Sequence, residues 1–196
     1  MNLQPLFETQ KTLDDRIEKE KGLEGQDLLD KKILALQVEL GELANEWRGF
    51  KFWSENQEPN TDICSKCDGK GMYTATVNNL SMTGKCNNCY GKGKHFDNPL
   101  LEEYVDCLHF ILSIGYTIGR NYFVYDEFLE EKQTNITKQF QRVFGYAFLI
   151  TEDNYCSELL MSFINLGEML GFTWEQIEQA YYDKNKINHE RQSNGY

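Results

Sequence analysis

The sequence predicts an all-α protein, a bundle of helices with one small insertion of a different kind. Residues 1–56 and 98–196 are rich in Leu, Glu, Lys, Ile and Phe at helical spacing, with only Pro5 and Pro99 as breaks. Residues 57–97 are rich instead in Gly, Asn, Cys, Thr and Lys, which is typical of turns and short hairpins. We therefore expect one helical domain, 1–56 with 98–196, and an inserted subdomain, 57–97.

The individual elements follow from the apolar periodicity. A chain of 196 residues, 40% of them hydrophobic, is long enough to bury one substantial core. Its formal charge of −11 argues against nucleic acid and acidic membranes as partners. Within the two helical stretches the pattern predicts helices near residues 4–20, 27–49, 99–119, 122–145, 155–170 and 174–189.

Neither a membrane segment nor a leader is expected. No apolar run approaches the roughly 20 residues that cross a bilayer. The first residues, MNLQPLFETQKTLDDRIEKE, lack the basic start and apolar stretch of a signal peptide. We therefore expect a cytoplasmic protein without a membrane partner.

The helix expected at 27–49 carries a row of acids. Glu39, Glu42 and Glu46 line up about 90° from the apolar stripe that includes Leu36 and Leu40. Leu34 and Val38 border the acids on the other side, which predicts that the carboxylates lie in a groove between two apolar strips. The alternative is an ordinary solvated helix face.

The helix expected at 99–119 is apolar around most of its circumference, which is typical of a buried helix. Acids on a buried helix are costly unless they are paired, protonated or bound to a cation. Its one polar stripe consists of Glu102, Glu103, Asp106, His109 and Ser113. We expect this stripe to meet the acids of the other helix.

Together the two helices would supply four oxygen donors, Glu39, Glu42, Glu103 and Asp106. Hard cations such as Mg²⁺ prefer carboxylate oxygens and share their remaining positions with water and substrate phosphates. The chemistry indicated is hydrolysis of a phosphoanhydride by metal-activated water. A di-iron bundle is a second interpretation, but it usually takes ExxH motifs from two helices, and Asp106 with His109 provides a single loose DxxH.

The C-terminal residues concentrate basic and amide side chains in an otherwise acidic chain. Lys184, Asn188 and Arg191 fall near one helical face, where two cations could clamp phosphates while an amide contacts a base edge. The alternative is a frayed, solvated tail whose cations favour the end of the helix dipole.

Four segments of the chain resemble motifs of one known family, and they occur in the same order as in that family. They are LFETQKTLDDRI, LALQVELGELANEWRGFKFWS, LEEYVDCLHFILSIG and KNKINHERQSNGY. The chain thereby resembles the dimeric, all-α dUTP pyrophosphatases, distant relatives of the MazG-type nucleotide pyrophosphatases. The insertion departs from the usual family pattern, while the motifs on both sides of it are intact.

The resemblance implies hydrolysis of dUTP to dUMP and pyrophosphate in a bundle that forms homodimers. It implies Mg²⁺ ligation by Glu39, Glu42, Glu103 and Asp106, with Glu46 orienting the water. It further implies nucleoside contacts from Gln10, Trp53, His109 and Asn185, and phosphate contacts from Lys184, Arg191 and Tyr196. Another substrate, such as dCTP or a modified triphosphate, stays open. So does a partner-binding module, in which the helical part is only a scaffold.

The insertion carries a metal-site motif. Cys64 with Cys67 and Cys86 with Cys89 form two CxxC pairs separated by eighteen residues, the spacing of a Cys₄ zinc site. The repeated CxxCxGxG resembles half of the cysteine-rich domain of DnaJ-type chaperones, where it supports protein contacts. We expect structural Zn²⁺, because so short a segment needs metal to fold; disulfides and redox chemistry are the alternatives. Cys107 and Cys156 are expected to be small buried residues.

Overall fold

The computed structural model describes residues 2–59, 67, 70–77, 80–86, 98–119, 131–150 and 155–195. This part of the chain confirms the all-α class, with a single hairpin as its only sheet. The elements are α1 (Gln4–Lys21), α2 (Leu29–Trp47), β1 (Met72–Val77), β2 (Leu80–Lys85), α3 (Pro99–Thr117), α4 (Ile136–Leu149), α5 (Cys156–Met169) and α6 (Trp174–Ser193).

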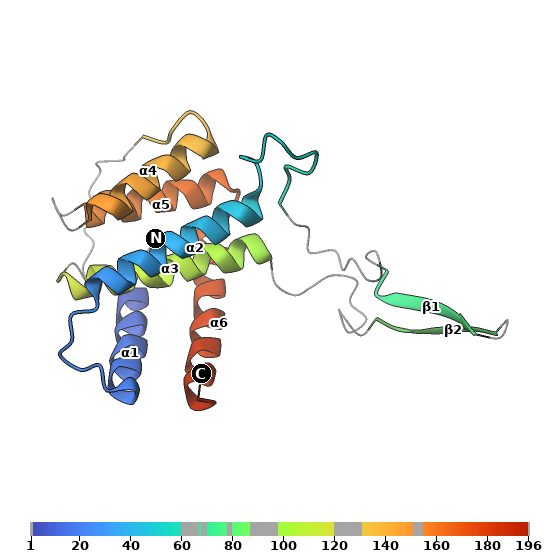
Figure 1. The fold of residues 1–196 in the computed structure, drawn as a ribbon, viewed down its shortest axis with the longest axis horizontal. Helices are drawn as coiled ribbons and strands as arrows, with labels where there is room; N and C mark the ends of the chain where they lie inside the picture. The colour runs from blue at the N-terminus through green and yellow to red at the C-terminus, as the bar shows by residue number, and fades with distance from the viewer. Residues whose placement is uncertain are drawn as a thin grey trace.

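Helix α3 is the centre of the bundle. It packs most extensively on α2, and it also contacts α1, α5 and α6. Figure 1 shows the α2–α3 pair with α4 and α5 along one side, while α1 and α6 stand next to each other on the other side, at a steep angle to the pair. The expectation of a buried helix at 99–119 is thus confirmed. In its polar stripe, His109 and Ser113 are buried, whereas Glu102, Glu103 and Asp106 are partly buried.

A cluster of aromatic rings fixes α5 against α3. The Tyr104 ring stacks on Phe163 with centroids 4.3 Å apart, and the Tyr104 hydroxyl donates to the Phe163 carbonyl at 3.1 Å. Gly167 lies directly against this ring, since a Cβ there would be 2.5 Å from Tyr104 Oη. Only glycine allows the two helices to approach this closely.

Three helix ends lie four residues or more from the expected positions, among them the end of α4, which is at Leu149 instead of 145. The helix expected from 122 begins at Ile136, because the Asn135 side chain accepts a hydrogen bond from the Lys138 amide as an N-cap; residues 120–130 lie outside the described part. Helix α6 continues past 189 to Ser193. Arg16 supports this last turn by donating to the His189 carbonyl at 3.0 Å.

The hairpin lies apart from the bundle in Figure 1. Its strands pair antiparallel from Met72 opposite Lys85 to Val77 opposite Leu80, and they have no contact with the described helices. Cys67 and Cys86 are buried together at its base. The Gly71 amide donates to Cys67 Sγ at 3.2 Å, and the Cys86 amide donates to the Gly71 carbonyl at 2.9 Å.

No helix within the described residues is both long and apolar enough to span a membrane.

Candidate active site

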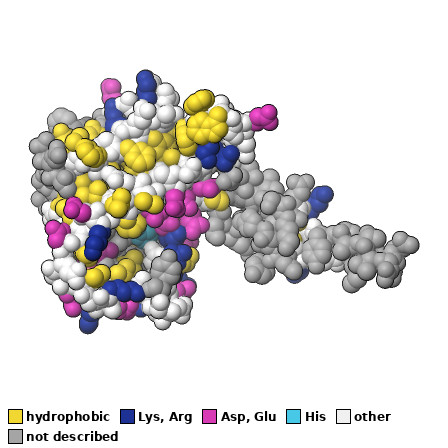
Figure 2. Space-filling model, viewed as in Figure 1, with side chains coloured by type: hydrophobic (Ala, Val, Ile, Leu, Met, Phe, Trp, Pro, Cys, Tyr) yellow, Lys and Arg dark blue, Asp and Glu magenta, His cyan; other side chains and the backbone are white. Residues whose placement is uncertain are grey.

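Three of the predicted metal ligands converge where α2 packs on α3. Glu39 comes from α2, and Glu103 and Asp106 come from α3. Their carboxylates can place one oxygen each within 4.8 Å of the others, and all three side chains are partly buried. Figure 2 shows acidic side chains gathered near the middle of the bundle on this face. Oxygen donors at this spacing fit a hard divalent cation.

Electrostatics within the cluster also fit a cation. Burial, followed by the charges of Asp106 and Glu42, raises the pKa of both Glu39 and Glu103 to about 7. Burial likewise raises the pKa of Asp106, although the Lys184 ammonium opposes the shift. Carboxylates that resist ionisation next to one another lower their energy when a divalent cation binds between them.

Glu42 and Glu46 stand outside this convergent group. Glu42 is exposed, yet its charge raises the pKa of both Glu39 and Glu103, so it lies close enough to join them. Glu46 is partly buried one turn further along α2. Their assigned roles stay predictions.

A pocket of about 340 Å³ opens beside the carboxylates, between α1, α2, α3 and α6. Glu39 and Asp106 form part of its wall. Four of the residues predicted to contact substrate also line it, namely Gln10, His109, Asn188 and Arg191. The structure therefore places two of the four predicted metal ligands and four of the predicted substrate contacts around one space.

His109 forms the inner wall of this pocket and is held in one tautomer. Its Nδ1 lies 2.6 Å from Gln10 Oε1, which is an acceptor, so Nδ1 carries the hydrogen. Burial, aided by the charge of Lys184, lowers the His109 pKa to about 3, and the ring stacks on Tyr181 at 4.2 Å. The imidazole is thus neutral with an acceptor at Nε2.

Three buried polar atoms have no hydrogen-bond partner among the described residues. They are His109 Nε2 and Gln192 Oε1, whose residues line the pocket, and Asn185 Nδ2 on the same helix as Gln192. Asn185 Nδ2 is a donor, and the other two are acceptors. Buried polar groups are rarely left unpaired, and a water molecule or a ligand is the usual partner. His109 and Asn185 are among the residues predicted to contact the nucleoside.

Other predicted residues lie elsewhere. Lys184 is buried between α3 and α6, where its Nζ donates to Asp106 Oδ2 at 2.6 Å. Trp53 is 66% exposed and does not line the pocket; its ring makes edge contacts with Phe50 and Phe52. Tyr196, like Cys64 and Cys89, lies outside the described residues.

A polar network in the pocket wall includes Asp14, Lys32 and Ser113, which were not among the predicted site residues. Asp14 accepts from Gln10 Nε2 at 2.8 Å and from the Ser113 hydroxyl, and Lys32 Nζ lies 3.4 Å from its carboxylate. Asp14 follows Gln10 by four residues, and Ser113 follows His109 by four. This shared spacing on two helices is the signal that could have revealed the network.

The apolar residues on the two sides of the α2 acids were expected to form two strips with the carboxylates in a groove between them. Their burial differs from this expectation on one side. Leu36 and Leu40 are fully buried, but Leu34 is 62% exposed and Val38 is 53% exposed. The predicted groove between two apolar strips of α2 is therefore wrong. The acids owe their burial to the packing of α3 instead.

Comparison with known proteins now adds to the geometry. A model of the family described as dUTPase matches residues 2–66 and 91–196. The chain belongs to the all-α dUTPase family. This confirms the resemblance of its four motifs, and it makes the protein a nucleoside triphosphate pyrophosphohydrolase rather than a helical scaffold alone. The match omits residues 67–90 of this dUTPase, the stretch that includes the hairpin and Cys86. No curated protein matches the chain significantly.

Proposed function

We propose that this dUTPase hydrolyses dUTP to dUMP and pyrophosphate with Mg²⁺ as its cofactor. The observation that carries the proposal is the meeting of Glu39, Glu103 and Asp106 beside a pocket, with Glu39 and Asp106 in a wall that also contains a neutral, buried histidine. Glu42 completes the proposed ligand set. Bound Mg²⁺ would polarise the phosphates and lower the pKa of the attacking water.

The protein side chains would divide the remaining work along the pocket. Glu46 would accept a hydrogen bond from the attacking water and orient it. Arg191, on the pocket wall, and Lys184, next to Asp106, would offset the negative charge of the phosphates. Tyr196 is proposed as a further phosphate contact. Asn188 lies on the same helix face as Arg191 and is proposed to contact substrate.

Two buried atoms without a partner, His109 Nε2 on the pocket wall and Asn185 Nδ2 on α6, support uracil over cytosine as the base. Uracil has a donor at N3 and an acceptor at O4, whereas cytosine has an acceptor at N3 and a donor at N4. An acceptor at His109 Nε2 and a donor at Asn185 Nδ2 complement the uracil edge and oppose the cytosine edge. Gln10 would hold the histidine tautomer, because its Oε1 accepts from His109 Nδ1 and from the Tyr181 hydroxyl at 2.9 Å.

A substrate panel tests this assignment. Pyrophosphate release should be measured for dUTP, dCTP, dTTP, UTP and dATP with Mg²⁺. We expect dUTP to be preferred over dCTP by at least roughly 100-fold in kcat/KM, because a mismatched edge leaves buried polar groups unpaired. Preference for a purine triphosphate would refute the uracil assignment, and preference for dCTP would support the alternative substrate.

A homodimer is the proposed assembly. Phe52 and Trp53 form an aromatic surface after α2, with exposed fractions of 85% and 66%. This surface supports a role for Trp53 at a contact with a second copy, where it could approach nucleotide. The molar mass in solution, measured by light scattering, tests the dimer; a monomer at all concentrations would refute it.

Residues 57–97 are proposed to form a separate subdomain around one structural Zn²⁺. Cys67 and Cys86 supply one thiolate from each CxxC pair and are buried next to each other. The amide of Gly71 donates to Cys67 Sγ, as suits a thiolate ligand. Cys64 and Cys89 would complete the tetrahedral set.

A further inference from the structure

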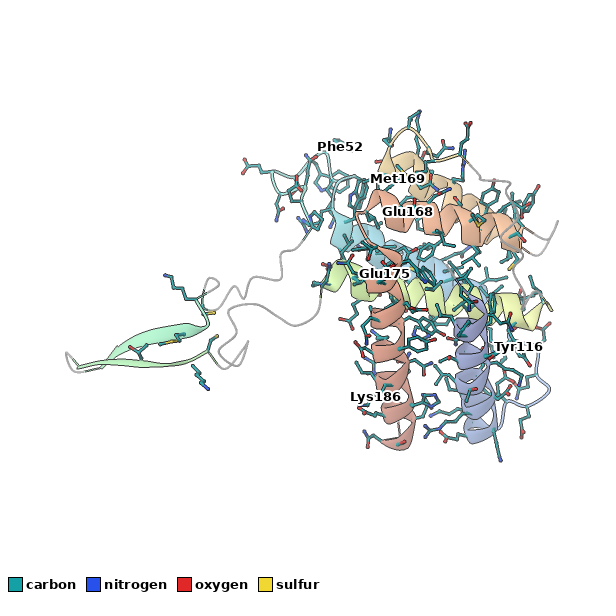
Figure 3. All side chains as sticks on the ribbon, turned by 180° about the vertical axis from the view of Figure 1, so that it is seen from behind. Phe52, Tyr116, Glu168, Met169, Glu175 and Lys186 are labelled. Carbon is teal, nitrogen blue, oxygen red and sulfur yellow. The ribbon has the colours of Figure 1, made fainter. Side chains whose placement is uncertain are left out.

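Lys184 lies between two pockets. A second pocket, of about 490 Å³, separates the start of α3 from α6, and its wall includes Glu102, Asp183 and Lys184. From there the Lys184 side chain reaches Asp106, on the wall of the pocket that holds the carboxylate cluster. Figure 3 shows the course of α6 away from α3, with Glu175 near its start and Lys186 further along.

The ammonium of Lys184 has two anionic partners. Its Nζ donates to Asp106 Oδ2 at 2.6 Å and to Glu102 Oε1 at 2.7 Å, and only 8% of the side chain is exposed. Glu102 and Asp106 are four residues apart on α3, so they meet the ammonium from one helix face. A buried ammonium needs such partners, because an unpaired charge there is costly.

These two partners cannot play the same role once a cation binds. Asp106 belongs to the cluster whose oxygens can meet around one ion, whereas Glu102 does not. A cation bound to Asp106 would compete with Lys184 for that carboxylate and would repel the ammonium. Glu102, 41% exposed, then remains as the carboxylate in contact with Lys184.

We infer that Glu102 is a positioning residue that keeps the Lys184 ammonium beside the catalytic metal when Asp106 is taken up by that metal. The inference rests on the proposed function, in which Lys184 serves the phosphates. Glu102 thereby makes cation binding to Asp106 more favourable, because the Lys184 ammonium keeps its hydrogen bond to a second carboxylate. It touches neither metal nor substrate.

The variant Glu102→Gln tests the inference in the full chain. Nucleotide-free binding of Mn²⁺, used as a probe for the metal site, should weaken by about tenfold or more, because Lys184 loses a charge-assisted hydrogen bond and competes more strongly for Asp106. At saturating Mg²⁺, kcat for dUTP should fall more than KM rises, since the ammonium is no longer held against the reacting phosphates. Glu102→Asp should recover part of both losses.

Two controls separate positioning from a general charge effect. Asp183→Asn removes a negative charge from the same pocket wall without touching Lys184, and it should leave Mn²⁺ affinity within about twofold of the wild type, as expected for an exposed charge. In a Lys184→Met background, Glu102→Gln should have little further effect on Mn²⁺ affinity. Circular dichroism checks that each variant is folded.

The inference is overturned if Glu102→Gln binds Mn²⁺ as the wild type does, or if its effect persists fully without Lys184. If Lys184→Met does not fold, the Mn²⁺ affinities of Glu102→Gln, Glu102→Asp and Asp183→Asn still test the inference. Failure of the proposed function has a different signature, because the wild type itself would then not hydrolyse dUTP with Mg²⁺ while the Mn²⁺ binding data stand.

Discussion

The helical bundle and the hairpin are stabilised in different ways. In the bundle, leucines and aromatic rings from α1 to α6 form one continuous buried cluster. In the described part of the hairpin, the buried apolar cluster consists of Cys67 and Cys86. A two-stranded hairpin is marginal on its own in water, so the insertion depends on something other than a core. The family match follows the same division, because it stops at 66 and resumes at 91.

Under the proposed function, catalysis and the insertion are separable. All the described residues that surround the carboxylate cluster and its pocket belong to helices or to the short segment before α2. The hairpin contributes none of them. Variants in one region should therefore leave the properties of the other intact, and the following predictions test this from the largest expected effect to the smallest.

Glu39→Gln should have the largest effect. It should lower the catalytic activity and leave the fold intact. Even an indirect partner of a metal ligand typically accounts for about 10–100-fold in activity, so loss of a ligand should lower kcat/KM by roughly 100-fold or more. The fold should survive, because burial and neighbouring charges already raise the pKa of this carboxyl to about 7. Pyrophosphate release and thermal unfolding measure the two properties. The exposed Glu24→Gln in the loop before α2 is the control; equal activity in both variants would contradict the assignment.

Cys86→Ser should abolish zinc binding while the bundle persists. The purified wild type should carry about one zinc per chain, measured by mass spectrometry of metals, and the variant close to none. Helical circular dichroism should be unchanged, because the hairpin has no contact with the described helices. Cys156→Ser, buried in the bundle, is the matched control and should retain zinc. Zinc near zero in the wild type would reject the metal site.

Gly167→Ala should destabilise the bundle without affecting the insertion. An added Cβ would lie 2.5 Å from Tyr104 Oη, and this ring cannot retreat because it is stacked on Phe163. Overpacking of this kind costs about 1–3 kcal/mol, and each kcal/mol lowers the Tm by roughly 2–4 °C at this size. Gly145→Ala, with open space around the new Cβ, should be neutral or stabilising. Zinc content should be the same in both.

The pH dependence of stability should show the smallest effect. Folding raises the pKa of Glu39 and Glu103 to about 7 from the usual value near 4.5. Between these values the folded state binds more protons than the unfolded state, so this contribution to stability falls as pH rises from about 4.5 to about 7. The Tm of the metal-free protein should drop by a few degrees relative to a Glu39→Gln, Glu103→Gln variant over this range. Added Mg²⁺ should reverse the drop, and parallel pH profiles would contradict the shifts.

The sequence was sufficient for the features that depend on local periodicity. Helix α3 could be predicted as buried because apolar residues surround it, and Glu103 and Asp106 could be paired with Glu39 because buried acids need a partner. The start of α4 at Ile136 could not be predicted from the sequence, because the apolar periodicity extends upstream of the Asn135 cap. Nor could the exposure of Leu34, because an apolar strip does not reveal whether another helix covers it.

Features that depend on long-range packing were out of reach. Asp14 and Ser113 are 99 residues apart. The spacing of four residues from Gln10 to Asp14 and from His109 to Ser113 indicates a polar face on each helix, but it does not show that the two side chains share a hydrogen bond. The same holds for Lys184 and Glu102, which are 82 residues apart. The resemblance to a family supplied Lys184 as a phosphate contact but gave no partner for it.

The position of α1 and α6 on opposite sides of one pocket has a consequence for biosynthesis. Gln10 belongs to α1, but Tyr181, whose hydroxyl donates to Gln10, and Asn188 belong to α6 and are synthesised after the other described helices. Domains fold as units when their last element is available. A nascent chain that lacks α6 therefore has its carboxylates without Lys184 and its histidine without the stacked tyrosine. Under the proposed function turnover requires α6, so chains cut before Trp174 should not hydrolyse nucleotide even where α2 and α3 have paired.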